Sequence, residues 1–477
     1  MISFLISIAA LILGYLIYGR VIERIFGPDD RKTPALAHPD GVDYIAMPTW
    51  KVFMIQFLNI AGTGPIFGAI MGAWFGPASY LWIVLGCIFA GSVHDYLSGM
   101  MSIRNDGASL PELIGKYLGK TMRIIMLIFS MVLLLMVGAV FVYSPASILA
   151  GIGGNVILWF VVIFIYYIIA TLLPIDKIIG KIYPIFAAAL IFMAIGLFVC
   201  LIIKMPVIPE VWDINNMDSW MTAQSHNGTD LLGMKKYLTA NTLFPAMFIT
   251  IACGAISGFH ATQSPLMARC LKSEKLGRPV FYGSMITEGF VALVWAAVSS
   301  WFFYSGGWRE VLPQDAVNEF LAQVGNTDGK SLIQYFNAPA VVKLVCSSWL
   351  GVVGGILAML GVVAAPITSG DTALRSARLI IADFLKFDQK PIAKRLMIAV
   401  PMFAAVLLLL IWQLANPNGF NVLWQYFGWS NQTLSVFTLW AITIFLHKYK
   451  KCYWVTLIPA IFMTTVSLTF IIQQIIG

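Results

Sequence analysis

Charged residues are scarce in this sequence: Asp, Glu, Lys and Arg together make up 11% of its 477 residues. Soluble domains carry roughly 25%, so a chain with so few charges cannot cover a water-facing surface. Hydrophobic residues reach 59%, and the apolar runs attain the ~20 residues that cross a bilayer. These runs are continuous rather than alternating, which excludes a β-barrel and predicts an all-α membrane protein.

Paired cysteines and catalytic motifs are also missing. The six cysteines are scattered without a CxxC pair or a Cys/His ligand spacing, so we expect no disulfide framework and no metal. The sequence has no HExxH, GxSxG or phosphate-binding loop. The net charge of +8 is assigned to cytoplasmic loops rather than to nucleic-acid binding. We therefore expect no enzyme activity, no cofactor and no nucleic-acid partner.

What the sequence does contain is a series of about twelve hydrophobic spans. They are predicted at residues 3–19, 52–73, 79–101, 122–143, 155–173, 182–203, 240–258, 280–304, 341–366, 394–414, 424–446 and 453–474. Basic and non-basic connections alternate along the chain, so the positive-inside rule places the basic loops in the cytoplasm and both termini outside. Amphipathic pieces at 110–118 and 374–385 are expected to lie along the bilayer surface or to extend a neighbouring span.

Two of these spans contain residues that a helix interior disfavours. The second carries Gly62, Gly64 and Pro65, and the seventh has a small-residue patch at 253–258. Inside a helix Pro costs about 3 kcal/mol and each Gly about 1 kcal/mol. Both spans are therefore predicted to unwind where these residues occur. Close helix packing through small residues is the alternative explanation.

The two breaks also suggest an internal symmetry. By the charge alternation, the second span runs outward and the seventh runs inward. Spans between 52 and 203 then form a repeat that is inverted relative to the spans between 240 and 446, with one additional helix at each end. Paired interrupted spans in inverted halves are the usual sequence sign of a transporter site.

Polar groups and exposed backbone at the breaks form the predicted substrate site. Its residues are Asn59, Ala61, Gly62, Thr63, Gly64, Gly254, Ser257 and His260. Backbone N–H groups at the start of a half-helix suit a carboxylate, and freed carbonyls suit Na⁺ or a proton donor. His260 has an alternative role as a hydrogen-bonded packing residue.

Ionisable and hydroxyl groups within the spans are the predicted sites for a coupling ion, because charge inside a membrane is costly. They are Asp95, Glu288, Thr368, Ser369 and Asp371. Simpler explanations stay open for each of them. Asp371 pairs with Arg375 one turn later, and the two hydroxyls bond their own helix backbone. Asp95 lies at the membrane interface a few turns from Arg104, and Glu288 snorkels or pairs with another group.

Several long stretches carry a specific family resemblance. They are Thr33-Pro-Ala-Leu-Ala-His-Pro-Asp-Gly-Val-Asp-Tyr44, Ile60-Ala-Gly-Thr-Gly-Pro65, Ala90-Gly-Ser-Val-His-Asp95, Arg104-Asn-Asp-Gly107, Phe248-Ile-Thr-Ile-Ala-Cys-Gly-Ala-Ile-Ser-Gly-Phe-His260, the block 368–378, and Phe427-Gly-Trp-Ser-Asn-Gln432. The sequence resembles the carbon starvation protein A (CstA) family of bacterial peptide transporters, some members of which import pyruvate with protons. It departs from the expected family pattern at His94 and Thr287.

The resemblance implies a fold of the leucine-transporter (LeuT) type, with two inverted five-span repeats. One transmembrane domain would then cover 1–477: an extra helix and loop at 1–50, the first repeat at 51–204, the second at 236–447 and a final helix at 452–477. The implied function is secondary active import of small peptides or pyruvate-like carboxylates across the bacterial inner membrane, by proton or sodium symport, in response to carbon starvation. A channel or a nutrient sensor is the alternative, and the oligomeric state stays open.

Overall fold

The computed structural model describes residues 1–150, 153–173, 179–212, 243–323, 332–333, 335–389, 391–416 and 419–476, and this part of the chain contains helices but no strand. Eight of its helices are long and apolar enough to cross a membrane, and a bent pair of helices brings the number to nine. The all-helical membrane fold is thus confirmed, whereas the count of about twelve spans stays a prediction.

The first half of the chain begins with a continuous helical rod of α1 (Ile2–Leu13), η1 (Gly14–Tyr18) and α2 (Gly19–Phe26), and the short α3 (Pro34–Ala37) follows in the next loop. The elements of the first repeat are α4 (Thr49–Ala61), η2 (Gly64–Gly68), α5 (Ala69–Gly72), η3 (Ala73–Phe75), α6 (Ala78–Gly86), η4 (Cys87–Gly91), α7 (Ser92–Ile103), α8 (Leu110–Leu118), α9 (Lys120–Ala150), α10 (Val156–Leu172) and α11 (Ile179–Lys204).

The second repeat starts with a helix that is also interrupted. Its elements are α14 (Leu243–Thr250), α15 (His260–Ala268), η5 (Glu274–Leu276), η6 (Arg278–Tyr282), α16 (Gly283–Tyr304), α17 (Gly307–Val311), α18 (Gln314–Gln323), α20 (Ala338–Trp349), α21 (Gly351–Leu385), α22 (Ile392–Ala415) and α23 (Gly419–Lys448), and α24 (Trp454–Ile476) follows. The start of the predicted second repeat at 236–242, which includes the start of the seventh span at 240–242, lies outside the described residues.

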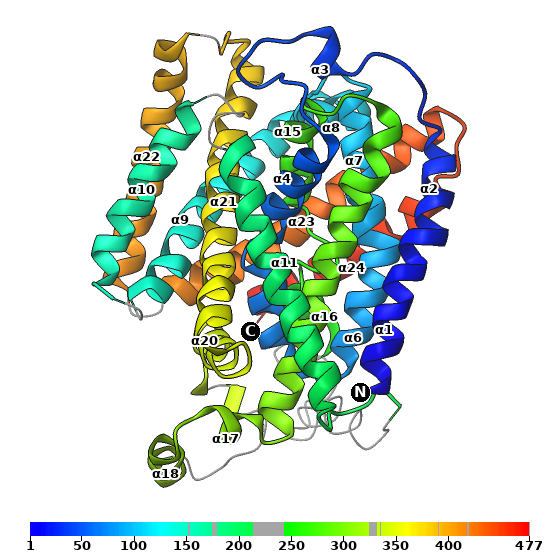
Figure 1. Ribbon diagram of the computed structural model, residues 1–477. Coiled ribbons are helices and arrows are strands. Elements are labelled where there is room, and N and C mark those ends of the chain that lie inside the picture. The colour runs from blue at the N-terminus through cyan, green and yellow to red at the C-terminus, as the bar shows by residue number, and fades with distance from the viewer. Residues whose placement is uncertain are drawn as a thin grey trace.

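The broken helices lie in the middle of the bundle. Helix α4 packs against α11, α16, α21 and α15, and α15 packs in turn against α7. In Figure 1 the N-terminus lies at the end of the molecule that carries α17 and α18, and α3 and α8 lie at the opposite end. The basic connections around α3 and α8 thus lie at the end away from the N-terminus, as the charge alternation requires.

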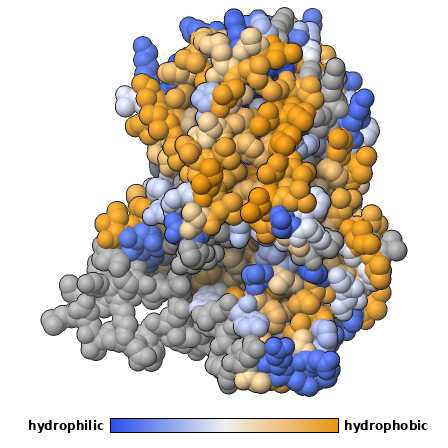
Figure 2. All heavy atoms as spheres, turned by 90° about the vertical axis from the view of Figure 1, so that its left-hand side faces the viewer, coloured by the Kyte–Doolittle hydropathy of each residue, from blue (hydrophilic) through white to orange (hydrophobic). Residues whose placement is uncertain are grey.

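The outside of the bundle is apolar in the way that lipid requires. Helices α10 and α22 direct large apolar side chains outward, among them Ile157, Val161, Leu408 and Ile411. Figure 2 shows hydrophobic side chains over most of the upper part of the face on this side, with hydrophilic ones at the top, across the middle and at the bottom. Polar groups such as Asn59 and His260 are instead buried in the interior, which is the distribution expected of a membrane protein.

One predicted span differs from the structure. The ninth, at 341–366, is not one helix, because α20 ends at Trp349 and α21 begins at Gly351. Gly351 has a φ of +64°, a left-handed conformation that terminates α20 and that glycine adopts without strain. The amphipathic piece 374–385 continues α21 rather than lying as a separate surface helix, and α8 is separate.

Candidate functional site

The first break separates α4 from the half-helix Gly64–Phe75, and the two parts are bent by 49°. Gly62 terminates α4 with a φ of 26° and a ψ of −147°. A side chain at Gly62 would be strained in this conformation, and its Cβ would lie 3.2 Å from the Phe141 ring. Phe67 N–H donates to the Thr63 carbonyl at 2.8 Å as the helix restarts. The predicted unwinding therefore occurs at the predicted residues.

The second break lies between α14 and α15, where residues 251–259 leave the helical path. Gly254 has a φ of +90°. Asn431 of α23 holds the unwound segment, because its Oδ1 accepts from the Phe259 N–H at 2.7 Å and from the Ser257 hydroxyl at 2.9 Å. The Gly258 N–H donates to the Asn431 carbonyl at 3.2 Å. Asn431 lies in the stretch Phe427–Gln432 that carries the family resemblance, but it is not among the site residues predicted from the sequence.

The two breaks lie directly against each other. A Cβ on Gly64 would come within 2.3 Å of both Cys253 Cβ and Cys253 Sγ, and one on Gly68 would lie 2.9 Å from the Thr250 carbonyl. Asn59 and Thr63 are fully buried at the first break, and among the residues that the structure describes their side-chain polar atoms have no hydrogen-bond partner. The fold thus brings the breaks of the two repeats together and leaves unpaired polar groups at the first of them.

Ser369 of α21 contacts the end of α4 at the first break. Its hydroxyl lies 3.1 Å from the Leu58 carbonyl and 2.9 Å from the Asn59 carbonyl. The neighbouring Thr368 hydroxyl instead bonds its own helix, at the Ala364 and Ala365 carbonyls. The two adjacent hydroxyls thus have different surroundings, and Ser369 is the one that shares the carbonyls of the broken helix.

Asp371 lies one turn of helix from Thr368 and is fully buried. The Tyr183 hydroxyl donates to Asp371 Oδ2 at 2.5 Å, and Asp371 Oδ1 has no hydrogen-bond partner within the described part of the chain. Arg375 does not pair with it, because its Nη1 bonds Asp43 at 3.2 Å and its Nη2 bonds the carbonyl of Ala170. The simple Asp371–Arg375 pair therefore does not form.

The other predicted ionisable residues form a buried chain at the second break. Asp95 of α7 hydrogen-bonds the Nδ1 atoms of His94 and His260, each at 2.8 Å. His260 Nε2 lies 3.5 Å from Glu288 Oε2 of α16. All four side chains are fully buried. Asp95 and Glu288 are therefore joined to His260, whereas Ser369 contacts α4.

A cluster of buried ion pairs lies at the end of the bundle that carries α3 and α8. Buried Asp43, in the loop before α4, faces Arg375 at 3.2 Å and Arg378 at 3.4 Å. Burial alone would raise the pKa of Asp43, but the guanidinium groups of Arg378 and Arg375 outweigh this effect and hold the pKa below its usual value. Arg269, at the end of α15, contacts Asp383 at 3.1 Å. Sequence reasoning did not select Asp43, although it lies in a stretch that carries the family resemblance.

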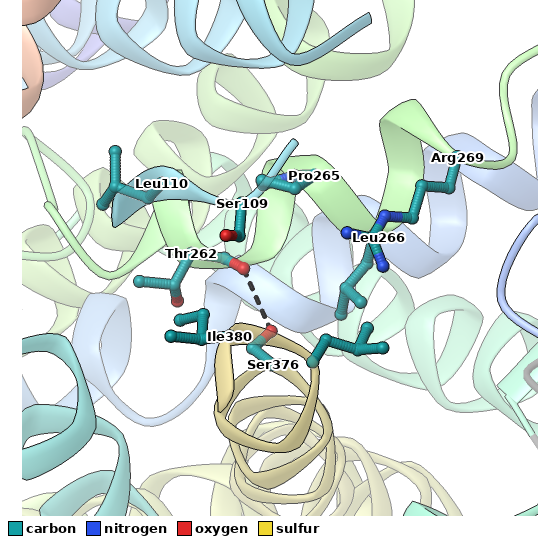
Figure 3. Close-up of a pocket in the computed structure, with 9 residues that line it drawn as sticks. Ser109, Leu110, Thr262, Pro265, Leu266, Arg269, Ser376 and Ile380 are labelled. Atoms are coloured by element: carbon teal, nitrogen blue, oxygen red, sulfur yellow. Dashed lines mark hydrogen bonds between the residues drawn. The ribbon is translucent and has the colours of Figure 1, made fainter. Parts of the chain in front are cut away.

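A small pocket opens beside these charges, between α8, α15 and α21. It is lined by Ser109, Leu110, Thr262, Pro265, Leu266, Arg269, Ser376, Leu379 and Ile380. Figure 3 shows the Ser376 hydroxyl directed at the Thr262 carbonyl, to which it donates at 3.0 Å. This contact ties α21 to α15 two residues beyond His260. The pocket thus lies at the same end of the bundle as the Asp43 cluster.

Comparison with known proteins places these features in a family. The family model described as carbon starvation protein CstA matches residues 1–155, 146–327 and 338–470. This chain belongs to the CstA family. Two full-length relatives are each named Peptide transporter CstA. The Escherichia coli protein is 26% identical, with 97% of this chain and 79% of the relative covered. The Campylobacter jejuni protein is 28% identical, with 98% and 79% covered.

Other comparisons extend this result. An uncharacterized membrane protein of Haemophilus influenzae is 44% identical, over 64% of this chain and 91% of its own length. Among solved structures, a Na⁺-coupled sialic acid symporter in a substrate-bound outward-open state matches with a TM-score of 0.54 at 13% identity, covering 98% of this chain and 96% of that one. A manganese transporter of Eremococcus coleocola matches with a TM-score of 0.55 at 12% identity, covering 91% and 90%. At these identities the matches show the fold, and they confirm the LeuT-like arrangement of the CstA chain.

Proposed function

We propose that this CstA-family protein is a secondary active transporter of the bacterial inner membrane that imports small carboxylate-bearing solutes by symport with Na⁺. The observation that carries the proposal is the contact between the two helix breaks, with buried and unpaired Asn59 and Thr63 beside it. Broken spans that meet at the centre of inverted repeats form the substrate sites of this transporter fold. The curated relatives are named peptide transporters, so short peptides are the first substrates to test, with pyruvate second.

The first break supplies the groups that a carboxylate needs. The half-helix Gly64–Phe75 begins at the break, and the dipole of a helix favours negative charge at its N-terminus. Asn59, in the last turn of α4, and Thr63, just before the half-helix, lie at this break, and the Asn59 amide and the Thr63 hydroxyl have no hydrogen-bond partner among the described residues. A solute carboxylate placed there would satisfy donors that are otherwise left unpaired.

The end of α4 supplies the groups that a cation needs. The Ser369 hydroxyl oxygen lies 3.1 Å from the Leu58 carbonyl oxygen and 2.9 Å from the Asn59 carbonyl oxygen. These are hard, uncharged oxygen donors, which suit Na⁺, and unwound carbonyls coordinate Na⁺ in this class of transporter. A cation bound here would contact both α4 and α21. Its affinity would therefore depend on the conformation of the first break.

Uptake into proteoliposomes tests the proposal. Purified protein should accumulate dialanine or pyruvate when an inward Na⁺ gradient is imposed. Ser369→Ala should raise the half-saturating Na⁺ concentration on the order of 10-fold, equivalent to about 1.4 kcal/mol, because one oxygen ligand is lost. Thr372→Ala is the matched control, since the Thr372 hydroxyl is buried on the same helix but bonds only the Thr368 and Ser369 carbonyls.

The outcomes separate the parts of the proposal. Uptake driven by a pH gradient and indifferent to Na⁺ would contradict the sodium assignment but leave symport intact. Uptake that ignores both gradients and never exceeds equilibrium would indicate a channel. If dialanine, pyruvate and single amino acids all fail to enter, the transport function itself is wrong for these solutes.

A further inference from the structure

We propose that Cys253, His260 and Glu288 form a binding site for a transition-metal dication, with Zn²⁺ as the first ion to test. The three residues come from the unwound segment of the second break, the first position of α15 and the second turn of α16. One ligand atom from each lies within 4.8 Å of the other two, and all three side chains are buried. The proposal concerns binding alone and does not depend on the transport function.

The separations are close to those of a zinc site. Zinc bonds of about 2.0–2.3 Å to nitrogen, oxygen and sulfur place tetrahedral ligand atoms roughly 3.3–3.8 Å apart. His260 Nε2 and Glu288 Oε2 are already 3.5 Å apart. The cluster as a whole therefore needs a contraction of about 1 Å, which side-chain rotations of Cys253 and Glu288 can supply. Three protein ligands leave a fourth position open for water or a solute atom.

The surroundings of His260 have the arrangement that metal-bound histidines show. Its Nδ1 hydrogen-bonds Asp95 Oδ2 at 2.8 Å, and the other Asp95 oxygen hydrogen-bonds His94 at 2.8 Å. A histidine that donates through Nδ1 to a carboxylate keeps the lone pair of Nε2 free for a metal, and such carboxylates are a regular partner of metal-binding histidines. The Asp95 carboxylate thus orients the imidazole with Nε2 toward Cys253 and Glu288.

Two of the three proposed ligands, His260 and Glu288, lack hydrogen-bond partners at the atoms that would bind the metal, whereas Cys253 Sγ lies 3.8 Å from both the Ser257 hydroxyl and the Asn431 amide nitrogen. His260 Nε2 and both carboxyl oxygens of Glu288 are buried without a hydrogen bond in the described structure. Leaving a buried polar group unpaired costs about 1–3 kcal/mol, and more for a charged one. A dication bound by a thiolate and a carboxylate forms a neutral unit, which lowers the cost of burying Glu288 inside the membrane. The mixture of sulfur, nitrogen and oxygen donors favours Zn²⁺ over Mg²⁺ or Ca²⁺.

Sequence reasoning expected no metal because no two of these residues have a ligand spacing. The fold supplies what the spacing lacks, since the break lets Cys253 turn toward His260 while α16 brings Glu288 alongside. Cys253 also lies at the contact between the breaks, where Gly64 leaves room for its sulfur. The lack of a side chain at Gly64 therefore makes space for the Cys253 thiol, in addition to its part in the helix break.

Metal binding to the purified full-length protein tests the proposal. After chelation and removal of the chelator, Co²⁺ should bind with a 1:1 stoichiometry, give a thiolate-to-cobalt charge-transfer band, and be displaced by Zn²⁺. Cys253→Ser should abolish that band, and His260→Gln and Glu288→Gln should each weaken binding by at least 10-fold. Asp95→Asn should weaken it on the order of 10–100-fold through the orientation of His260. Cys346→Ser is the matched control, because Cys346 is equally buried on α20, and it should bind like the parent protein.

A second measurement covers variants that fail to fold. In the unaltered protein Zn²⁺ should protect Cys253 from alkylation, as mapped by peptide mass spectrometry, and a chelator should remove the protection. Absence of stoichiometric Co²⁺ or Zn²⁺ binding would overturn the proposal, as would a charge-transfer band that survives in Cys253→Ser. A protein that binds no metal, but whose Glu288→Gln form has an altered pH profile of uptake, would indicate that a proton occupies this cluster instead.

Discussion

The glycines at the two breaks have different structural roles. Gly62 and Gly254 have left-handed backbone conformations, with φ values of 26° and +90°. Gly64 and Gly258 instead make close contacts, since a Cβ on either would come within 2.3 Å of a neighbouring heavy atom. Unwinding and close packing are alternative explanations at the level of sequence, and the structure shows both. Gly254 combines them, since its Cβ would also lie 2.5 Å from the Ala292 Cβ. The sequence predicts that these positions require glycine. It does not predict whether the reason is backbone conformation or close packing, because the packing depends on the opposing helix.

Gly258→Ala tests the packing task. Its Cβ would lie 2.2 Å from the Ser435 nitrogen and 2.3 Å from the Asn431 carbonyl oxygen. Both are backbone atoms of α23, so the clash cannot be relieved by a rotamer change. We expect α23 to be displaced from the break, unfolding stability to fall by about 1–3 kcal/mol, and uptake to be lost. Thermal unfolding in detergent and proteoliposome uptake measure the two effects. Gly153→Ala, with nothing within 4 Å of its Cβ, is the control. Parent-like values for Gly258→Ala would show that the contact is not tight.

Elements differ in how far the sequence predicts them. The breaks in α4 and between α14 and α15 are predictable because Gly62, Pro65 and Gly254 act locally on the backbone. The division of the ninth predicted span at Gly351 was missed, because the apolar residues on both sides have the hydropathy of one span. The contacts of Asp95 with His260, 165 residues apart in the chain, were also out of reach. Such contacts depend on helix packing, which hydropathy and charge do not specify.

The contribution of the loop before α4 to the stability of the fold can be measured with one substitution. Asp43→Asn would leave the buried guanidinium groups of Arg375 and Arg378 without their carboxylate. Removing one partner of a buried ion pair costs about 3–5 kcal/mol. We expect the variant to unfold at a lower temperature and to open more readily at the α3–α8 end, where a cysteine-reactive probe should reach Cys270, next to Arg269, faster. Asp30→Asn is the control, because Asp30 is exposed.

The pH dependence of this effect follows from the pKa of Asp43. Its folded-state pKa lies below the usual value near 3.9. The carboxylate therefore contributes stability above pH ~4, and this contribution is lost as pH falls through the lowered folded-state pKa. The difference in unfolding temperature between the parent and Asp43→Asn should be constant from about pH 5 to pH 8. A difference that shrinks within that window would mean that Asp43 titrates much higher and is not held by the two arginines.

At the scale of the whole molecule, the distribution of polarity is opposite to that of a soluble protein. The interior holds Asp95, His260, Glu288 and Asp371, while α10 and α22 expose apolar side chains. Buried charged groups gather at the second break, around His260, and at the α3–α8 end, around Asp43. The predicted sidedness follows from charge alternation alone, and it needs a test of its own.

Cys452 offers that test without any change to the protein. Of the six cysteines, all within the described residues, Cys452 is exposed, Cys200 is half-buried and the other four are buried. It lies between α23 and α24 beside Lys448, Lys450 and Lys451, so the positive-inside rule places it in the cytoplasm. A membrane-impermeant maleimide should therefore label it in inside-out vesicles but not in intact cells. Gly153→Cys in the non-basic loop between α9 and α10 should show the reverse pattern. Labelling of Cys452 from outside would show that the predicted orientation is wrong for every helix, and that each break faces the opposite side of the membrane.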